Sequence, residues 1–150
     1  MAPSYRHESV SFLLAQIIVV LAEELEMPFI AAGRTTFKRE NLEKGLEPED
    51  CFYFKSSPLI VGKTELDLTQ DPPPDLAIEV VSPGDSADEI ERKIDLYLSH
   101  GSSRVWVVYT TSRRIQVRQS SGISMLGEDS LIDAPEIFPG WSVRVSDLLV

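Results

Sequence analysis

Apolar residues recur at helical spacing near the N-terminus. From His7 to Glu26 the chain is rich in Leu, Ile, Val, Ala and Glu, and its apolar positions fall three or four residues apart. This period predicts a helix with a wide buried face. Met27-Pro28 should end it, because proline cannot continue a helix. The positions on the buried face are Val10, Leu13, Leu14, Ile17, Ile18, Leu21 and Leu25.

Strand-like segments follow this helix. Phe29 to Lys38 predicts a strand pair or an irregular strand, and Cys51 to Phe54 predicts a short strand, because β-branched and aromatic residues favour extended backbone. Leu76 to Val81 is a nearly unbroken apolar run between prolines. That pattern is typical of a central strand covered on both faces.

The second half of the chain alternates between helix and strand signals. Ser86 to Glu89 is a capping-box pattern, and the helix that it opens should run to about Ser99 and stop at Gly101. The order of elements predicts an α/β (α+β) fold with a mixed central sheet flanked by helices, in one domain over residues 1–150. The remaining elements are expected as a second central strand at Val105–Tyr109, an outer strand at Ile115–Arg118, a loop or hairpin at Ser124–Leu131, a strand at Trp141–Val145 and a helical turn at Ser146–Leu149.

Composition narrows the class of protein. The chain has 150 residues, of which 43% are hydrophobic and one is cysteine, so a disulfide framework is excluded. The longest apolar stretch, Phe12 to Ala22, has 11 residues, whereas a membrane span needs roughly 20. We therefore expect a soluble, cytoplasmic protein.

The charge is strongly acidic but uneven. A net charge of −10 argues against nucleic-acid binding when it is taken globally, since such binding rests on phosphate neutralisation. From Gly101 to Gly122, however, there are four arginines and no acid. This distribution allows a basic face beside an acidic pocket.

Glu79 is the most informative residue because it interrupts the apolar run. Burying an ionised carboxylate costs several kcal/mol unless it is paired or bound to a metal. The structural alternative is a glutamate at a strand end, solvated or paired with an arginine. A Mg²⁺ ion between two carboxylates would explain an acid in these surroundings, and it would also lower the pKa of an attacking water.

Several other acids are candidate partners of Glu79. Asp75 precedes it by four residues, which places their Cα atoms roughly 13 Å apart, so Asp75 either begins the strand or supports the site without touching the same ion. Glu49 and Asp50 stand before the Cys51–Phe54 strand, and at most one of them should point toward Glu79, since they are adjacent. Weaker candidates are Glu65, Asp67 and Asp71.

Lys93 flanks the inner stripe of the helix that follows Glu79. It could reach back over the strand end and activate a water or neutralise phosphate charge. The blander alternative, and the commoner one, is an i,i+4 ion pair with Glu89. His7 and His100 have no partner in sequence and are interpreted as residues at helix ends.

Three segments of the chain carry a resemblance to a known family: Pro74-Asp75-Leu76-Ala77-Ile78-Glu79-Val80-Val81-Ser82-Pro83, then Lys93 with Tyr97, and then Val105-Trp106-Val107-Val108. Together they resemble the Uma-type putative restriction endonucleases of the PD-(D/E)XK nuclease superfamily. Lys44 to Tyr53 resembles the upstream acidic strand of that family, and Phe138 to Leu149 resembles its closing segment. The resemblance implies a restriction-endonuclease-like core with a magnesium-dependent phosphodiesterase site, in which Mn²⁺ is a substitute.

Carried over by position, Glu79 is the central metal-binding acid, and Lys93 is a relocated lysine, because the usual place holds Val81. The family pattern expects Asp after Pro48, but this chain has Glu49 followed by Asp50. Phosphate contacts would come from Arg34, Lys38 and Arg39, or from Arg104, Arg113, Arg114 and Arg118.

Two functions follow from these observations. The first is a metal-dependent endonuclease that cuts DNA, with Glu79, Lys93, Glu49, Asp50 and Asp75 as site residues. The second is an inactive binding or assembly module on a nuclease-like scaffold, which the acidic charge, the Glu49-Asp50 order and Val81 favour. A homodimer is the default expectation, because two-fold symmetry is the commonest oligomeric arrangement.

Overall fold

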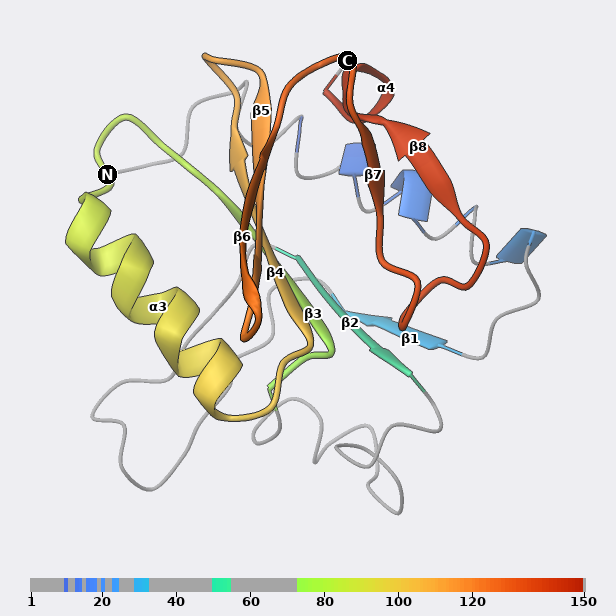
Figure 1. Cartoon of the computed structure of the whole chain (residues 1–150), viewed down its shortest axis with the longest axis horizontal. Coiled ribbons are helices and arrows are strands. Elements are labelled where there is room, and N and C mark those ends of the chain that lie inside the picture. Colours follow the sequence, from blue (N-terminus) through green and yellow to red (C-terminus); the bar gives the residue numbers. More distant parts are fainter. Residues whose placement is uncertain are drawn as a thin grey trace.

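The computed structural model describes residues 10, 13, 14, 16–18, 20, 23, 24 and 73–149, and the backbone of 29–32 and 50–54. Its centre is a six-stranded sheet in the order β1-β2-β3-β4-β5-β6 (Figure 1). Only the β3–β4 pair in this sheet is parallel, so the sheet is mixed, as predicted. The strands are β1 (Phe29–Ala32), β2 (Asp50–Phe54), β3 (Leu76–Val80), β4 (Arg104–Tyr109), β5 (Arg114–Gln119) and β6 (Gly122–Leu126).

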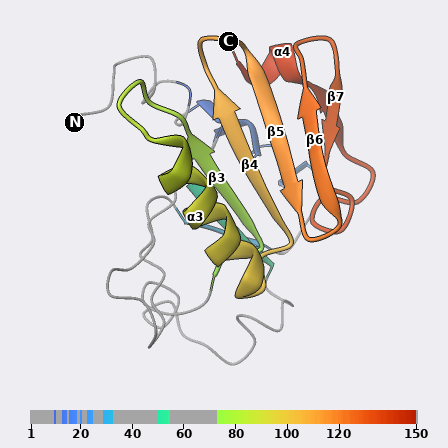
Figure 2. The same cartoon turned by 60° about the vertical axis from the view of Figure 1, so that its left-hand side comes forward.

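Three smaller elements close the chain, and one helix crosses between the parallel strands. Helix α3 (Ala87–Ser99) connects β3 to β4 and runs alongside these strands (Figure 2). A two-stranded sheet of β7 (Leu131–Asp133) and β8 (Ser142–Arg144) precedes the short helix α4 (Val145–Leu148). The described residues between 10 and 24 are helical, as their period predicts.

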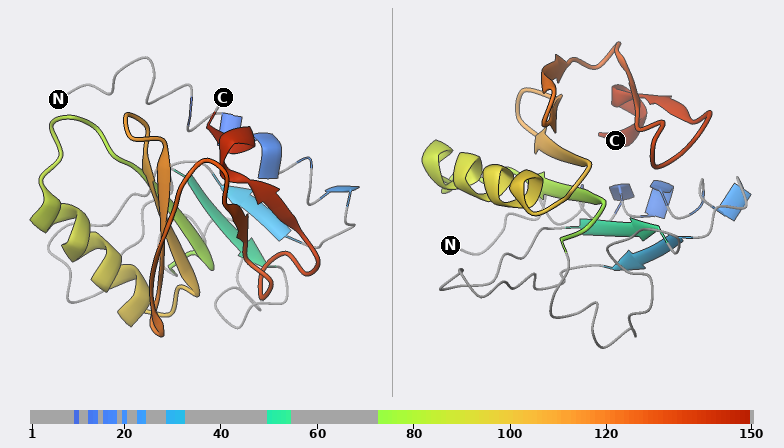
Figure 3. Two further views of the ribbon diagram at one scale, coloured as in Figure 1. Left: turned by 45° about the horizontal axis from the view of Figure 1, so that its top comes forward. Right: turned by 60° about the horizontal axis from the view of Figure 1, so that its bottom comes forward.

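The two faces of β3 enter different parts of the core. Leu76, Ile78 and Val80 are buried in a large apolar cluster that also contains the N-terminal helical residues and the C-terminal segment. Ala77 instead packs with Ile94 and Tyr97 of α3. Since side chains alternate along a strand, Glu79 shares the α3 face with Ala77. Figure 3 shows α3 and the C-terminal elements as separate layers about the sheet.

Helix α3 begins and ends at the residues that the sequence indicates. The Ser86 hydroxyl accepts a hydrogen bond from the Glu89 amide at 3.1 Å, which satisfies one of the unpaired amides at the helix start. The helix ends at Ser99, and Gly101 adopts a φ of 119°, a conformation that glycine reaches without steric cost. These signals fix the position of Lys93 and Tyr97 relative to β3.

One sequence-based prediction about the strands is wrong, and for another the structure agrees with one of its two alternatives, the hairpin. Ile115–Arg118 does not form an outer strand, because β5 lies between β4 and β6. The segment from Ser124 includes most of β6, which pairs with β5 in an antiparallel hairpin. In the part of the chain that the structure describes, no helix has both the length and the apolar character needed to cross a membrane.

Candidate active site

Glu79 lies under α3 and is held by two of its side chains. The residue is 6% exposed. The Tyr97 hydroxyl donates a hydrogen bond to Glu79 Oε1 at 2.9 Å, and Lys93 Nζ lies 3.7 Å from Oε2. Lys93 and Tyr97 are four residues apart on one helix, so they lie on the same face. Each carboxylate oxygen therefore has its own partner on α3.

This arrangement decides between the alternatives for Lys93. The lysine reaches back to the Glu79 strand, and Glu89 pairs instead with Arg92, at 3.3 Å. The positive charge of Lys93 and the hydrogen bond from Tyr97 together offset part of the cost of burying the carboxylate. Among the described residues, the side chains that contact the buried Glu79 carboxylate come from α3 and not from an arginine.

A small cavity of about 20 Å³ adjoins the Glu79 carboxylate. It has room for roughly one water-sized species, since a water needs about 10–15 Å³ of such volume. Asp85 and Glu89 contribute to its lining, beside Glu79 and Lys93. Asp85 is placed there by a tight turn, in which its carboxylate accepts a hydrogen bond from the Ser82 amide at 2.7 Å.

Sequence reasoning missed two features of this site. The sequence singles out Tyr97 only within the segment that resembles the endonuclease family and gives it no contact with Glu79, although its spacing of four residues from Lys93 signals a shared helix face. Asp85 was not considered, although it follows the Ser82-Pro83-Gly84 segment directly after the strand. Both residues owe their place to contacts between β3 and the chain that follows it.

The ligand atoms near Glu79 are of the type that a hard cation prefers, but the described residues supply too few of them to hold one. Carboxylate oxygens are the ligands that Mg²⁺ prefers. Within residues 73–149 and the described parts of the N-terminal helix, no group of three potential ligands is close enough to hold a metal ion. The further donors that the sequence predicts are Glu49, directly before β2, and Asp50, the first residue of β2.

The structure places the predicted partner acids unequally. Asp75 is buried directly before β3, and its carbonyl accepts hydrogen bonds from the amides of Ser103 and Arg104 at 3.0 and 3.2 Å. It thus stands where the strand begins, as one of the two expectations has it. Asp50 is the first residue of β2, and its register partner is Ile78. The predicted candidates outside the described residues are Glu49, Glu65, Asp67 and Asp71.

Three arginines of the Gly101–Gly122 stretch are engaged by carboxylates of the chain itself. Arg104 pairs with Glu136, and Arg113 pairs with Glu128. Arg118 forms two hydrogen bonds with Glu91 of α3, at 2.8 and 2.9 Å. These pairs compete with the predicted role of the three arginines in binding phosphate. Arg114, the fourth arginine of the stretch, is exposed at the start of β5. The remaining predicted phosphate contacts, Arg34, Lys38 and Arg39, lie outside the described residues.

The Glu91–Arg118 pair also shifts the ionisation of its members. Hydrogen bonds from the Arg118 guanidinium hold the pKa of Glu91 below its usual range, and the Glu91 carboxylate raises the pKa of Arg118. Both groups therefore stay charged at neutral pH. Their pairing ties α3 to β5 on the same face of the sheet as Glu79.

The chain is similar to a family and to a solved structure that are both described as putative nucleases. A family model described as putative restriction endonuclease matches residues 1–146. Among solved structures, the chain is similar to the crystal structure of a putative nuclease belonging to DUF820 from Anabaena variabilis, with a TM-score of 0.80 and 18% identity over 99% of this chain and 83% of that chain. No curated protein matches. The structural likeness confirms the predicted mixed α+β fold.

Proposed function

This chain belongs to the Uma2 family of putative restriction endonucleases, and we propose from that membership that it is a metal-dependent endonuclease which hydrolyses DNA phosphodiester bonds. The observation that carries the proposal is the buried Glu79 carboxylate, which lies between Lys93 and Tyr97 and borders a cavity of about 20 Å³. A nuclease role agrees with the family description and with the similar nuclease structure.

Each residue has a distinct part in this proposal. A bound Mg²⁺ would polarise the phosphodiester and lower the pKa of a water. Glu79 supplies a fixed negative charge to hold the cation, and the Tyr97 hydrogen bond keeps that carboxylate in one orientation. Lys93 supplies a positive charge next to the same carboxylate, where it can stabilise charge that develops on the phosphate. Hydrolysis then adds water across one P–O bond and leaves a phosphate and a hydroxyl end.

We propose Glu49 rather than Asp50 as the upstream metal-binding acid. Residues opposite each other in an antiparallel ladder share a face, and neighbours along a strand alternate. The partner of position 50 is Ile78, which lies on the face opposite Glu79. The alternation of a strand leads us to expect that the residue one before position 50 shares the Glu79 face.

Calorimetric titration with Mn²⁺ would check the choice of upstream acid. Glu49→Gln is expected to weaken Mn²⁺ binding by at least roughly 10-fold, as loss of a group that supports a metal site does. Asp50→Asn should change it much less, and it serves as the matched control because it removes the same charge one residue away. A larger loss with Asp50→Asn would reverse the assignment.

A plasmid assay tests the proposed activity directly. The purified protein should nick or linearise supercoiled plasmid in Mg²⁺ or Mn²⁺, and an excess of EDTA should stop the reaction. The same plasmid incubated with protein in EDTA from the start is the control. Cleavage that continues in EDTA would contradict the metal requirement, and no cleavage with either ion would contradict the nuclease proposal.

The alternative function is an inactive binding or assembly module. The observation that favours it is the contact of Lys93 with Glu79, because a lysine charge next to the carboxylate competes with a cation for it. This alternative predicts neither heat of Mn²⁺ binding nor cleavage. A Mn²⁺ isotherm that disappears in Glu79→Ala would decide against it.

A further inference from the structure

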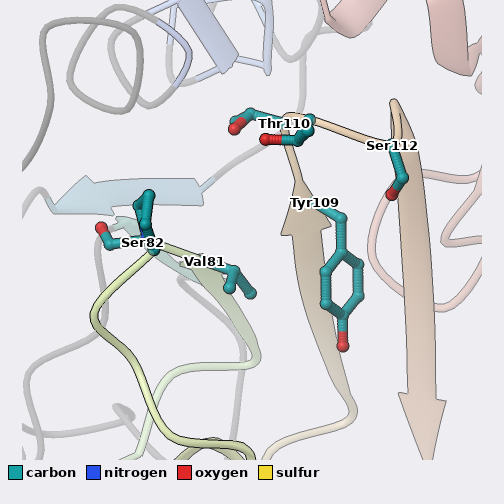
Figure 4. A pocket seen from close by; sticks show the side chains of 7 residues that line it. Val81, Ser82, Tyr109, Thr110 and Ser112 are labelled. Carbon is teal, nitrogen blue, oxygen red and sulfur yellow. The ribbon is translucent and has the colours of Figure 1, made fainter.

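A second and larger hollow lies at the carboxyl ends of β3 and β4. Its volume is about 370 Å³, which falls within the range of roughly 300–1,000 Å³ that is usual for sites of small organic ligands. Figure 4 shows Val81 and Ser82 on one side of this hollow and Tyr109, Thr110 and Ser112 on the other. Pro83 and Thr111 complete the lining. We call it the hydroxyl hollow.

The hydroxyl hollow adjoins the Glu79 site through β3. Val81 lines both the small cavity and the hydroxyl hollow. It stands two residues after Glu79, so its side chain lies on the same face of the sheet, roughly 7 Å farther along. Tyr109 likewise stands two residues after Val107, the register partner of Glu79. If the phosphodiester of a nucleic-acid strand lies at Glu79, the neighbouring base and sugar of that nucleic acid can therefore enter this hollow.

The lining chemistry suits a neutral ligand with a flat ring. None of the seven lining residues carries a charged side chain, and five of them carry a hydroxyl. Hydroxyls both donate and accept hydrogen bonds, so they can pair with either kind of group on a base or sugar. Tyr109 adds an aromatic ring, on which nucleic-acid bases stack. A phosphate would find no cation in this lining.

The wall formed by the β4–β5 turn is anchored from outside the hollow. Arg113, directly after Ser112, has a φ of 53°, a left-handed conformation that is uncommon for residues with a side chain. Its guanidinium donates a hydrogen bond to the Leu149 carbonyl at 2.6 Å and pairs with Glu128. These contacts tie the turn that carries Thr110, Thr111 and Ser112 to the C-terminal segment, so this wall of the hollow is anchored to the rest of the chain.

We propose that the hydroxyl hollow is a nucleoside subsite, which receives the base and sugar next to the phosphodiester held at Glu79. The subsite rests on the proposed nuclease function, and it deepens that function by assigning a residue that positions the substrate. Tyr109 provides the stacking surface, and Thr110, Thr111 and Ser112 provide hydrogen bonds. Such a subsite reads a nucleoside that has left the base stack, because a stacked base does not expose its faces to an aromatic side chain.

Oligonucleotide binding separates this subsite from the metal site. In a Glu79→Gln background, which prevents cleavage, fluorescence anisotropy would compare a labelled single-stranded 12-mer with an abasic 12-mer that has the same number of phosphates. Tyr109→Ala is expected to weaken binding of the normal 12-mer by about 10-fold, which is within the effect of losing one stacked base. Binding of the abasic 12-mer should not change, and Tyr109→Phe should retain most of the affinity.

Thr111→Val provides a second variant at an exposed position of the turn, where loss of a hydroxyl does not threaten the core. It is expected to weaken only the normal 12-mer, by several-fold. The proposal is overturned if the unsubstituted background binds the two oligonucleotides equally, or if Tyr109→Ala weakens both alike. If Mg²⁺ supports no plasmid cleavage while the base-dependent binding persists, the nuclease function fails and the nucleoside subsite remains.

Discussion

Glu79→Gln is expected to lower the rate of metal-dependent plasmid cleavage by roughly 100-fold to 1,000-fold, the effect of removing one preorganised charge from an active site. Glutamine keeps the size of the side chain and an oxygen that can accept the hydrogen bond from Tyr97. It loses the negative charge that faces Lys93 and the cavity. The variant should therefore fold but fail to hold a cation.

The measurement is the initial rate of nicking by equal amounts of protein in Mn²⁺, accompanied by circular dichroism and a thermal melt. Asp95→Asn is the matched control, because Asp95 is an exposed acid of α3 that lines neither cavity. It should cut at the rate of the unsubstituted protein. If Glu79→Gln also cuts at that rate while it remains folded, the active site lies elsewhere.

The sheet strand that carries Glu79 was predictable because several local signals agree there. Leu76 to Val81 is apolar except for Glu79 and lies between prolines, and the structure buries all five residues of β3. Ser86 and Gly101 likewise mark the two ends of α3 in the sequence. Local chemistry of this kind is independent of the tertiary fold, so it is readable without a structure.

Strands β5 and β6 were harder to predict, because the polar and apolar residues in them do not match the interior or edge position of each strand in the sheet. Arg118 is polar and belongs to an interior strand, where Glu91 of α3 satisfies its guanidinium. Ile123 and Met125 are apolar but 60% and 49% exposed on the edge strand β6. Alternation of polar and apolar residues normally marks a half-solvated strand, and the two cases break that rule in opposite directions.

The partners of Glu79 could be predicted only in part. Lys93 was a candidate because it flanks the inner stripe of its helix. Whether it pairs with Glu89 or with Glu79 depends on how α3 lies alongside β3, which no spacing along the chain encodes. The Tyr97–Glu79 hydrogen bond joins residues 18 positions apart and depends on the same packing. The predicted roles of Glu49 and Asp50 stay predictions.

Lys93→Met is expected to reduce cleavage by roughly 100-fold, since positioned proton-transfer or charge-stabilising groups contribute about that much. The Lys93 side chain is mostly buried, with 29% of its surface exposed. Methionine preserves most of its apolar part and removes the positive charge. Mn²⁺ binding measured by calorimetry should stay the same or become tighter, because the lysine no longer competes for Glu79. The opposite responses of cleavage and metal binding distinguish Lys93 from a metal ligand.

The double variant tests whether the two residues act as one unit. Glu79→Gln with Lys93→Met is expected to cut no more slowly than Glu79→Gln alone, because groups that act together are not additive in their effects. Multiplication of the two single losses would mean that Lys93 works independently of Glu79. If Lys93→Met alone loses Mn²⁺ binding, the role of Lys93 is to position the Glu79 carboxylate for the metal. The lysine would then not act by stabilising charge on the phosphate.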